Sequence, residues 1–253
     1  MRTIKLLIAY DGTDFCGWQR QAGSGAQGVR TVQSVIEDAL ETMHGHPAAL
    51  TGAGRTDSGV HAAGQCAHFY TDIESIDPPR FVPALNGLLP QDVRVLEAAE
   101  AAPDFHARFD ARGRTYRYFF ICGRRTLPHE SRYALRLWRQ PRIEKLNAYC
   151  RLLLGERDCS IFAGAGDTSK SRSRHISHAA FFAEGRQLVF EISANAFLWK
   201  MVRSIAGTFL HYEERGAPPE QLRDIIASGR REQAGPTLPP HGLFLWKVDY
   251  YRQ

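Results

Sequence analysis

Segments with strand character alternate with segments of helical period along almost the whole chain, and this alternation limits the folds open to it. Residues 3–12 are predicted to form a strand that ends at an Asp-Gly turn. Residues 31–43 place their apolar side chains on one helical stripe and begin with Thr31, a residue type that caps helices. Further strands are expected at 64–71 and 93–101, with a short helix within 80–90.

The second half of the chain continues this alternation. A helix expected at 198–216 places Lys200, Arg203 and Gly207 opposite its apolar stripe, so Arg203 is expected to point away from the packing face. The other expected elements are a strand at 114–123, a helix at 143–156 ended by Gly155, a hairpin at 178–197 that turns at Glu184 and Gly185, a helix at 218–229 and a strand at 242–251.

Together these patterns predict an α+β fold of two similar α/β halves, each with a mainly antiparallel sheet flanked by helices. A boundary near residue 105 would divide the chain into an N-terminal half, 1–105, and a C-terminal half, 106–253. A length of 253 residues is enough for two modest domains.

Apolar runs and cysteine usage indicate the cellular compartment in which the protein is expected. No apolar run is long enough to span a membrane, and the N-terminus lacks the apolar region and cleavage site of a secretory signal. The five cysteines are scattered, and none forms a C-x-x-C pair. We therefore expect reduced thiols, no zinc ribbon and a cytoplasmic protein.

Positive charge is concentrated in the middle of the chain. Residues 106–142 contain ten arginines and only two acids, Asp110 and Glu130, whereas the whole chain has a net charge of +5. Arginine outnumbers lysine 27 to 5, which a GC-rich genome would also explain, but genome composition does not explain the clustering. A local arginine cluster favours a polyanionic partner such as a nucleic acid.

The segment 52–64, GAGRTDSGVHAAG, holds one carboxylate, Asp57, in a setting of small residues. Such a segment permits unusual backbone dihedrals and close approach of a ligand. The neighbouring Arg55 favours the ionised form of Asp57, and an accessible carboxylate serves as a nucleophile or a general base. Alternatively, Arg55 binds phosphate, or the segment is only an Asp-Ser-Gly turn. A metal site of Asp57, His61 and His68 has no recognised ligand spacing.

A second loop is expected at 164–175, where glycine, serine and basic residues gather. One interpretation is a mobile loop that faces a ligand, and the alternative is a surface loop without a role.

GRTDSGVHA resembles the catalytic motif of the tRNA pseudouridine synthase A (TruA) family. Four more motifs resemble the family in the same order, over about 240 of 253 residues. They are YDGTDFCGWQRQ (10–21), FHARFDARGRTYRY (105–118), NAFLWKMVRSIAG (195–207) and GPTLPPHGLFLWKVDY (235–250). The stretch 159–175 matches the family only loosely, so RNA contacts from it are not implied.

The resemblance implies roles for single residues. Asp57 matches the essential aspartate, Arg203 its basic partner, and Tyr116 the residue that stacks on the target base and assists proton removal. Arg55 matches the arginine that helps to displace the target base. Arg108 and Arg114, which lie in the central motif, are expected to contact the substrate.

The resemblance also implies a reaction and its partners. The family converts uridine to pseudouridine in the anticodon stem-loop of tRNA, at positions 38–40, without a cofactor or a metal. It works as a homodimer, with the active-site cleft between the two halves of each chain. The target uridine must be flipped out of its stack, and Tyr116, Tyr118 and Phe120 would share one face of a strand beside the arginines.

Two other functions stay open from sequence alone. A non-catalytic RNA-binding protein explains the arginines and aromatic residues, but not an acid in a glycine-rich loop, since that acid would repel phosphate. A metal-dependent nuclease would need a second acidic cluster, which the sequence lacks. Asp11 and Trp18, in the first of the five motifs, are expected either to shape a loop near the bound RNA or to form a purely structural turn.

Overall fold

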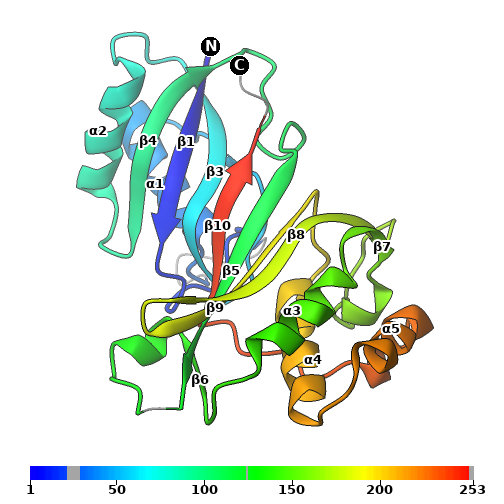
Figure 1. The fold of residues 1–253 in the computed structure, drawn as a ribbon. Helices are drawn as coiled ribbons and strands as arrows, with labels where there is room; N and C mark the ends of the chain where they lie inside the picture. The colour runs from blue at the N-terminus through cyan, green and yellow to red at the C-terminus, as the bar shows by residue number, and fades with distance from the viewer. Residues whose placement is uncertain (22–28, 124, 251–253) are drawn as a thin grey trace. The chain divides into compact units, whose positions relative to one another are not determined.

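A computed structural model describes residues 1–21, 29–123 and 125–250 (Figure 1). The chain forms two compact units. Unit 1 combines Met1–Arg112 with the chain from Phe244 onward, and unit 2 is Gly113–Leu243. The chain therefore crosses between the units twice, at 112/113 and at 243/244. Both units contain strands and helices, which confirms the predicted α+β class.

Unit 1 contains a sheet with the strand order β4-β1-β3-β10, and β2 pairs with β3. All of these pairings are antiparallel except that of β10 with β3, which is parallel. The elements are β1 (Arg2–Tyr10), α1 (Val32–His44), β2 (Thr51–Gly52), β3 (His61–Thr71), α2 (Phe81–Leu88), β4 (Val93–Ala101) and β10 (Leu243–Asp249), with a 3₁₀ turn at Pro78–Arg80.

The helices of unit 1 pack on the sheet through β3. The ring of Phe69 on β3 meets the edge of His44 on α1 and the edge of Phe81 on α2. Thr31 caps α1 as predicted, since its hydroxyl accepts the Ser34 N–H and the Ser34 side chain accepts the Thr31 N–H. One part of the core of unit 1 therefore lies between these helices and β3, and a second cluster gathers Ala53, Cys66, Phe105 and Ala107.

Unit 2 contains a sheet with the order β5-β9-β8-β7, and β6 pairs in parallel with β5. Its elements are β5 (Gly113–Cys122), β6 (Leu135–Leu137), α3 (Ile143–Arg151), β7 (Gly155–Asp158), β8 (Ser173–Glu184), β9 (Gln187–Ala194), α4 (Met201–Glu214) and α5 (Pro219–Ser228), with 3₁₀ turns at Glu130–Arg132, Ser160–Phe162 and Arg231–Gln233. Buried aromatic rings of α3, α4, β8 and β9 form its core.

Two expected helices are shorter than predicted. The helix expected at 143–156 ends at Arg151, and Gly155, with a positive φ of 87°, begins β7 instead of ending the helix. The helix expected at 198–216 begins only at Met201, since Lys200 adopts a left-handed conformation with φ of 61°. The hairpin at Glu184 and the helix ended by Gly229 are confirmed.

No helix among the described residues is both long and apolar enough to cross a membrane.

Candidate active site

The loop that carries Asp57 is held by its backbone. The Trp18 N–H donates to the carbonyl oxygen of Thr56 at 3.1 Å, and the hydroxyls of Thr56 and Tyr10 share a hydrogen bond of 2.8 Å. Thr56 and Val60 are buried, whereas Asp57 is half-buried between them. The residues on either side of the carboxylate thus anchor the loop while Asp57 keeps access to solvent.

Glycines in the first motif allow this close approach. Gly17 has φ of 91°, and a Cβ there would lie 2.6 Å from the carbonyl oxygen of Thr56. A Cβ on Gly12 would lie 2.0 Å from the carbonyl oxygen of Val60. No side chain fits at either position without moving the loop backbone. The segments 10–21 and 52–61, which the sequence analysis treated as separate motifs, form one structure.

Asp57 begins a turn, as the structural alternative supposed. The Val60 N–H donates to the Asp57 carbonyl oxygen at 3.1 Å, and Gly59 has φ of 76°. Phe15 holds the turn from outside, because its carbonyl oxygen accepts from the Gly59 N–H and the Ser58 hydroxyl. A turn and a chemical role are compatible here, since the backbone carbonyl of Asp57 closes the turn.

Trp18 and His61 support the loop from inside unit 1. Trp18 is 1% exposed, and its ring would collide with any Cβ on Gly52. His61 is fully buried, and its Nδ1 accepts the Gly12 N–H at 3.0 Å and lies 3.1 Å from Asp11 Oδ1. Its ring stacks on Phe244 of β10 with centroids 4.5 Å apart. Asp11 and Trp18 were expected either to shape a loop near the RNA or to form a structural turn. These contacts show that both residues pack against the Asp57 loop.

His68 belongs to the core of unit 1 rather than to the loop. Its Nδ1 accepts the Ala107 N–H at 3.1 Å. Burial lowers the pKa of His68, and the nearby His106 lowers it further, so the ring is held neutral. Across the described ranges there is no group of three or more His, Cys, Asp or Glu side chains that could hold a metal ion.

Unit 1 also holds two of the predicted substrate-binding arginines. Arg55 is exposed two residues before Asp57. Arg108 is exposed in the loop after β4, where its guanidinium lies 5.8 Å from the ring centroid of Phe109. Phe109 is itself 75% exposed and stacks on His106.

Unit 2 brings Arg114 and Tyr116 onto one face of β5. Tyr116 is 8% exposed and meets the ring of Phe197 edge-on, with centroids 5.0 Å apart. The Arg114 guanidinium donates to the Asn195 carbonyl oxygen at 2.8 Å. Both partners lie just beyond β9, in the motif that also contains Arg203.

The two central tyrosines differ in their surroundings. The Tyr118 hydroxyl donates to the Pro239 carbonyl oxygen at 2.6 Å in a fully buried position. Burial raises the pKa of Tyr118 far above its ordinary value, although Arg203 opposes the shift. Tyr118 is therefore a neutral core residue, and Tyr116 is the less enclosed of the two, at 8% exposed against 0%.

Arg203 is more enclosed than the sequence predicted. Its Nε donates to the Leu238 carbonyl oxygen at 2.7 Å, and the side chain is half-buried. A Cβ on Gly207, one turn later, would lie 1.8 Å from the Pro236 carbonyl oxygen. Arg203 was expected to point away from the packing face of its helix, but the segment 235–238 packs on that side of α4 as well. The paired Gly207 and Gly235 were the sequence signal for this close packing.

The loop 164–175 is tied to the start of α4. The Trp199 N–H donates to Asp167 Oδ2 at 2.6 Å, and the Gly164 N–H donates to the Trp199 carbonyl oxygen at 2.8 Å. Burial raises the pKa of Asp167, but hydrogen bonds from the Trp199 and Ser169 N–H groups outweigh this and lower it. Lys200 follows with the only positive φ among the described non-glycine residues. Asp167, which sequence reasoning missed, thus helps to set where the Arg203 helix begins.

Several members of the arginine cluster have structural partners. Arg117 Nε lies 2.6 Å from Glu191, and Arg139 and Arg142 both bind the buried carboxylate of Glu213. Arg124 lies outside the described residues. Charge density along the sequence therefore overstates the number of arginines available to a polyanion.

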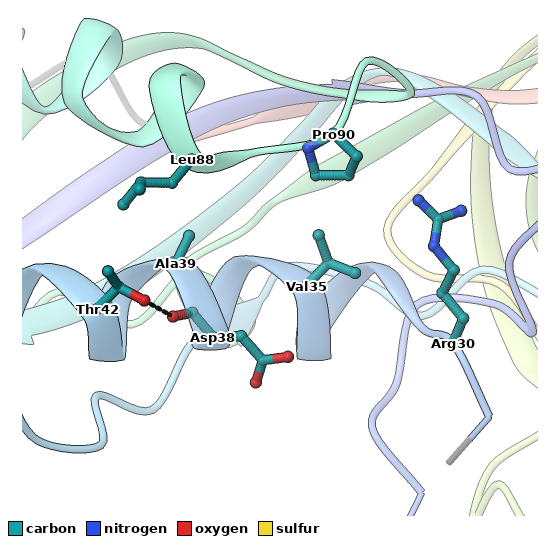
Figure 2. A pocket seen from close by; sticks show the side chains of 7 residues that line it. All are labelled: Arg30, Val35, Asp38, Ala39, Thr42, Leu88 and Pro90. Carbon is teal, nitrogen blue, oxygen red and sulfur yellow. Dashed lines mark hydrogen bonds between the residues drawn. The ribbon is translucent and has the colours of Figure 1, made fainter. Parts of the chain in front are cut away.

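A groove between α1 and the end of α2 contains none of the predicted site residues (Figure 2). Arg30 lines one end of it, but its guanidinium binds Asp92 at 2.7 and 2.9 Å and lies over the ring of Phe15. Arg30 thus stabilises the first motif, and its guanidinium is already bound to Asp92.

Comparisons with known proteins identify the family of the chain. A family model described as tRNA pseudouridine synthase matches residues 6–110 and 149–251. A protein named tRNA pseudouridine synthase A from Treponema denticola is 53% identical over 98% of this chain and 93% of its own. Proteins of the same name are 48% identical in Treponema pallidum, over 95% of this chain and 85% of their own, and 38% identical in Exiguobacterium sibiricum, over 99% and 97%. The chain therefore belongs to the tRNA pseudouridine synthase family, isomerases that convert uridine to pseudouridine in tRNA.

Proposed function

We propose that this isomerase acts on uridines 38–40 in the anticodon stem-loop of tRNA, with Asp57 as its essential carboxylate. The observation that carries the assignment of Asp57 is the loop around it. Thr56 and Val60 are buried on either side, and Gly12 and Gly17 let the first motif approach the loop backbone. The loop therefore presents one half-buried carboxylate from a rigid backbone, which is the arrangement that positioned acid–base or nucleophilic chemistry needs.

The reaction breaks the C1′–N1 bond of uridine, turns the base and joins C1′ to C5. Three roles are open to Asp57: attack on C1′, attack on the base, or removal of the 2′ proton. The proton at C5 must then leave, and Asp57 and Tyr116 are the candidate bases. A stem uridine has to be flipped out first, which costs a few kcal/mol that phosphate contacts offset.

Arg203 is assigned as the basic partner that orients Asp57 and keeps it ionised. Its Nε is held by Leu238, which restricts the direction of the guanidinium. We expect Arg203→Ala to slow turnover strongly while tRNA binding is kept. Tyr116 would stack on the target base, Arg55 would help to displace that base, and Arg108 and Arg114 would contact the tRNA.

We further infer that the enzyme is a homodimer that works in the cytoplasm. The dimer rests on the family resemblance and is tested by sedimentation velocity, where a monomer at micromolar concentration would contradict it. The compartment rests on the tRNA substrate and on the absence of any disulfide among the described cysteines.

The first experiment measures tritium release from tRNA labelled at uridine C5, with wild type and Asp57→Asn compared in the presence of chelator. Release by wild type alone is the expected result, since substitution at C5 expels that hydrogen. Mapping pseudouridine in the product then tests positions 38–40. Full release by Asp57→Asn would remove Asp57 from the chemistry. Shortened RNA or a loss of activity with chelator would favour a nuclease instead.

A further inference from the structure

Trp138 is 83% exposed, the highest value among the Phe, Tyr and Trp side chains that the structure describes. It directly follows β6, whose residues Leu135–Leu137 pair with Phe120–Cys122 of β5. Strand alternation puts Arg136 and Trp138 on the same side of this segment. A large apolar ring exposed to solvent directly after a paired strand indicates a surface that binds another molecule.

Arg136 completes this surface. Its guanidinium carbon lies 4.2 Å from the centroid of the Trp138 ring. Unlike Arg117, Arg139 and Arg142, Arg136 makes no ion pair with any carboxylate that the structure describes. An arginine stacked on an indole presents a π-face for a base and a planar donor fork for a phosphate at the same place.

We propose that Arg136 and Trp138 form a platform for an unpaired nucleotide of the tRNA, with the base stacked on Trp138 and a phosphate bound by Arg136. This inference rests on the proposed function for the identity of the RNA. Stacking on aromatic rings beside positive charge is how proteins bind single-stranded nucleotides without reading their sequence.

Charge favours RNA over a second copy of this chain. Residues 125–138 contain three arginines (Arg125, Arg132 and Arg136) and one acid, Glu130. In a two-fold symmetric contact the patch would face itself, and its positive charges would meet. Phosphate has the complementary charge.

The platform contacts a part of the tRNA other than the target uridine. Tyr116 lies near the start of β5, whereas β6 pairs with the last residues of the same strand. Six residues of strand between Tyr116 and Cys122 correspond to about 20 Å. A nucleotide on Trp138 is thus several nucleotides away from a base stacked on Tyr116.

The test compares tRNA affinity, KM and kcat for wild type, Trp138→Ala and Trp138→Phe, with Arg223→Ala as a control that removes an exposed arginine from α5. Loss of the stack should raise Kd and KM about 10-fold in Trp138→Ala with kcat unchanged. Trp138→Phe should retain most of the affinity, and Arg223→Ala should match wild type.

Sedimentation velocity on the same variants tests whether this surface binds a second copy of the chain instead of tRNA. A Trp138→Ala protein that binds tRNA like wild type overturns the proposal, and so does one whose affinity falls only because its oligomeric state has changed. Direct binding of unlabelled tRNA is measured independently of tritium release. Failure of the platform can therefore be told apart from failure of the assigned reaction.

Discussion

Two carboxylates of this chain sit in opposite surroundings. Asp57 lies half-buried in a loop that backbone hydrogen bonds and the hydroxyls of Thr56 and Ser58 hold in place. Glu213, near the end of α4, is fully buried and accepts hydrogen bonds from the side chains of Arg139 and Arg142 and from the Arg142 N–H. The side chain of Asp57 stays partly exposed to solvent, whereas the buried side chain of Glu213 stabilises the fold through its ion pairs. A motif points to the former, whereas only the structure points to the latter.

Asp57→Ala should have the largest effect on activity and almost none on stability. Removing the carboxylate that we propose as essential should lower turnover by about 10³-fold or more. The buried neighbours Thr56 and Val60 still anchor the loop, so tRNA affinity and the free energy of unfolding should stay near wild type. Tritium release, filter binding and urea unfolding measure the three quantities. A large loss of stability would show that Asp57 resembles Glu213 after all.

Trp18→Ala should destabilise the protein strongly, because it empties the space beneath the Asp57 loop. Truncating a fully buried aromatic side chain costs about 3–5 kcal/mol. The exposed Trp138 offers a matched control, since Trp138→Ala should leave the free energy of unfolding unchanged. Urea unfolding of both variants checks the prediction. Equal stabilities would mean that the loop does not depend on the packing of Trp18.

Glu213→Gln should lower stability by about 2–4 kcal/mol, because the two arginines lose their charged partner. Tritium release per folded molecule should stay within a few-fold of wild type. This is the reverse of the pattern expected for Asp57. An unchanged free energy of unfolding would contradict the structural role.

The stabilising effect of Glu213 should also depend on pH in a defined direction. Burial alone raises the pKa of Glu213, but hydrogen bonds from Arg139 and Arg142 outweigh it and lower the pKa below the ordinary 4.5. The unfolded chain therefore binds this proton more readily than the folded chain. The stability difference between wild type and Glu213→Gln should be complete above about pH 4.5 and shrink as the pH falls through the lowered value.

The smallest expected effect is on the salt dependence of tRNA binding, which should distinguish arginines that contact phosphate from arginines that stabilise the fold. Arg136→Ala should reduce the slope of log affinity against log salt by about one ion, as for one lost phosphate contact. Arg117→Ala removes an arginine that binds Glu191, so the slope should stay the same. tRNA binding across a salt series measures both, and equal slopes for the two variants would erase the distinction.

Much of the fold could be predicted because local patterns determine it. Apolar periodicity identified the helix capped by Thr31 and the hairpin at Glu184, and the structure confirms both. Helix ends were less predictable where a residue beside the helix adopts left-handed backbone dihedral angles. Lys200 adopts a positive φ that residue type does not suggest, and its surroundings decide it.

The site could be predicted only as a set of residues. Motif order singled out Asp57, Tyr116 and Arg203, and their catalytic roles stay predictions. Contacts between distant segments lay beyond the sequence. The approach of Gly17 to Thr56, the cover of Arg203 by Leu238 and the bond of Asp167 to Trp199 all depend on the folded chain.

The return of β10 to unit 1 has a consequence for biosynthesis. His61 stacks on Phe244, and β3 pairs with β10 through Phe244 and Leu245. These residues are translated after the whole of unit 2. While a ribosome makes the chain, unit 1 emerges first but lacks one strand and the partner of His61. A nascent chain that stalls before residue 244 would therefore display the acid loop without the Phe244 ring against His61 and without the pairing of β3 with β10, so the order of translation completes unit 1 only when this strand has emerged.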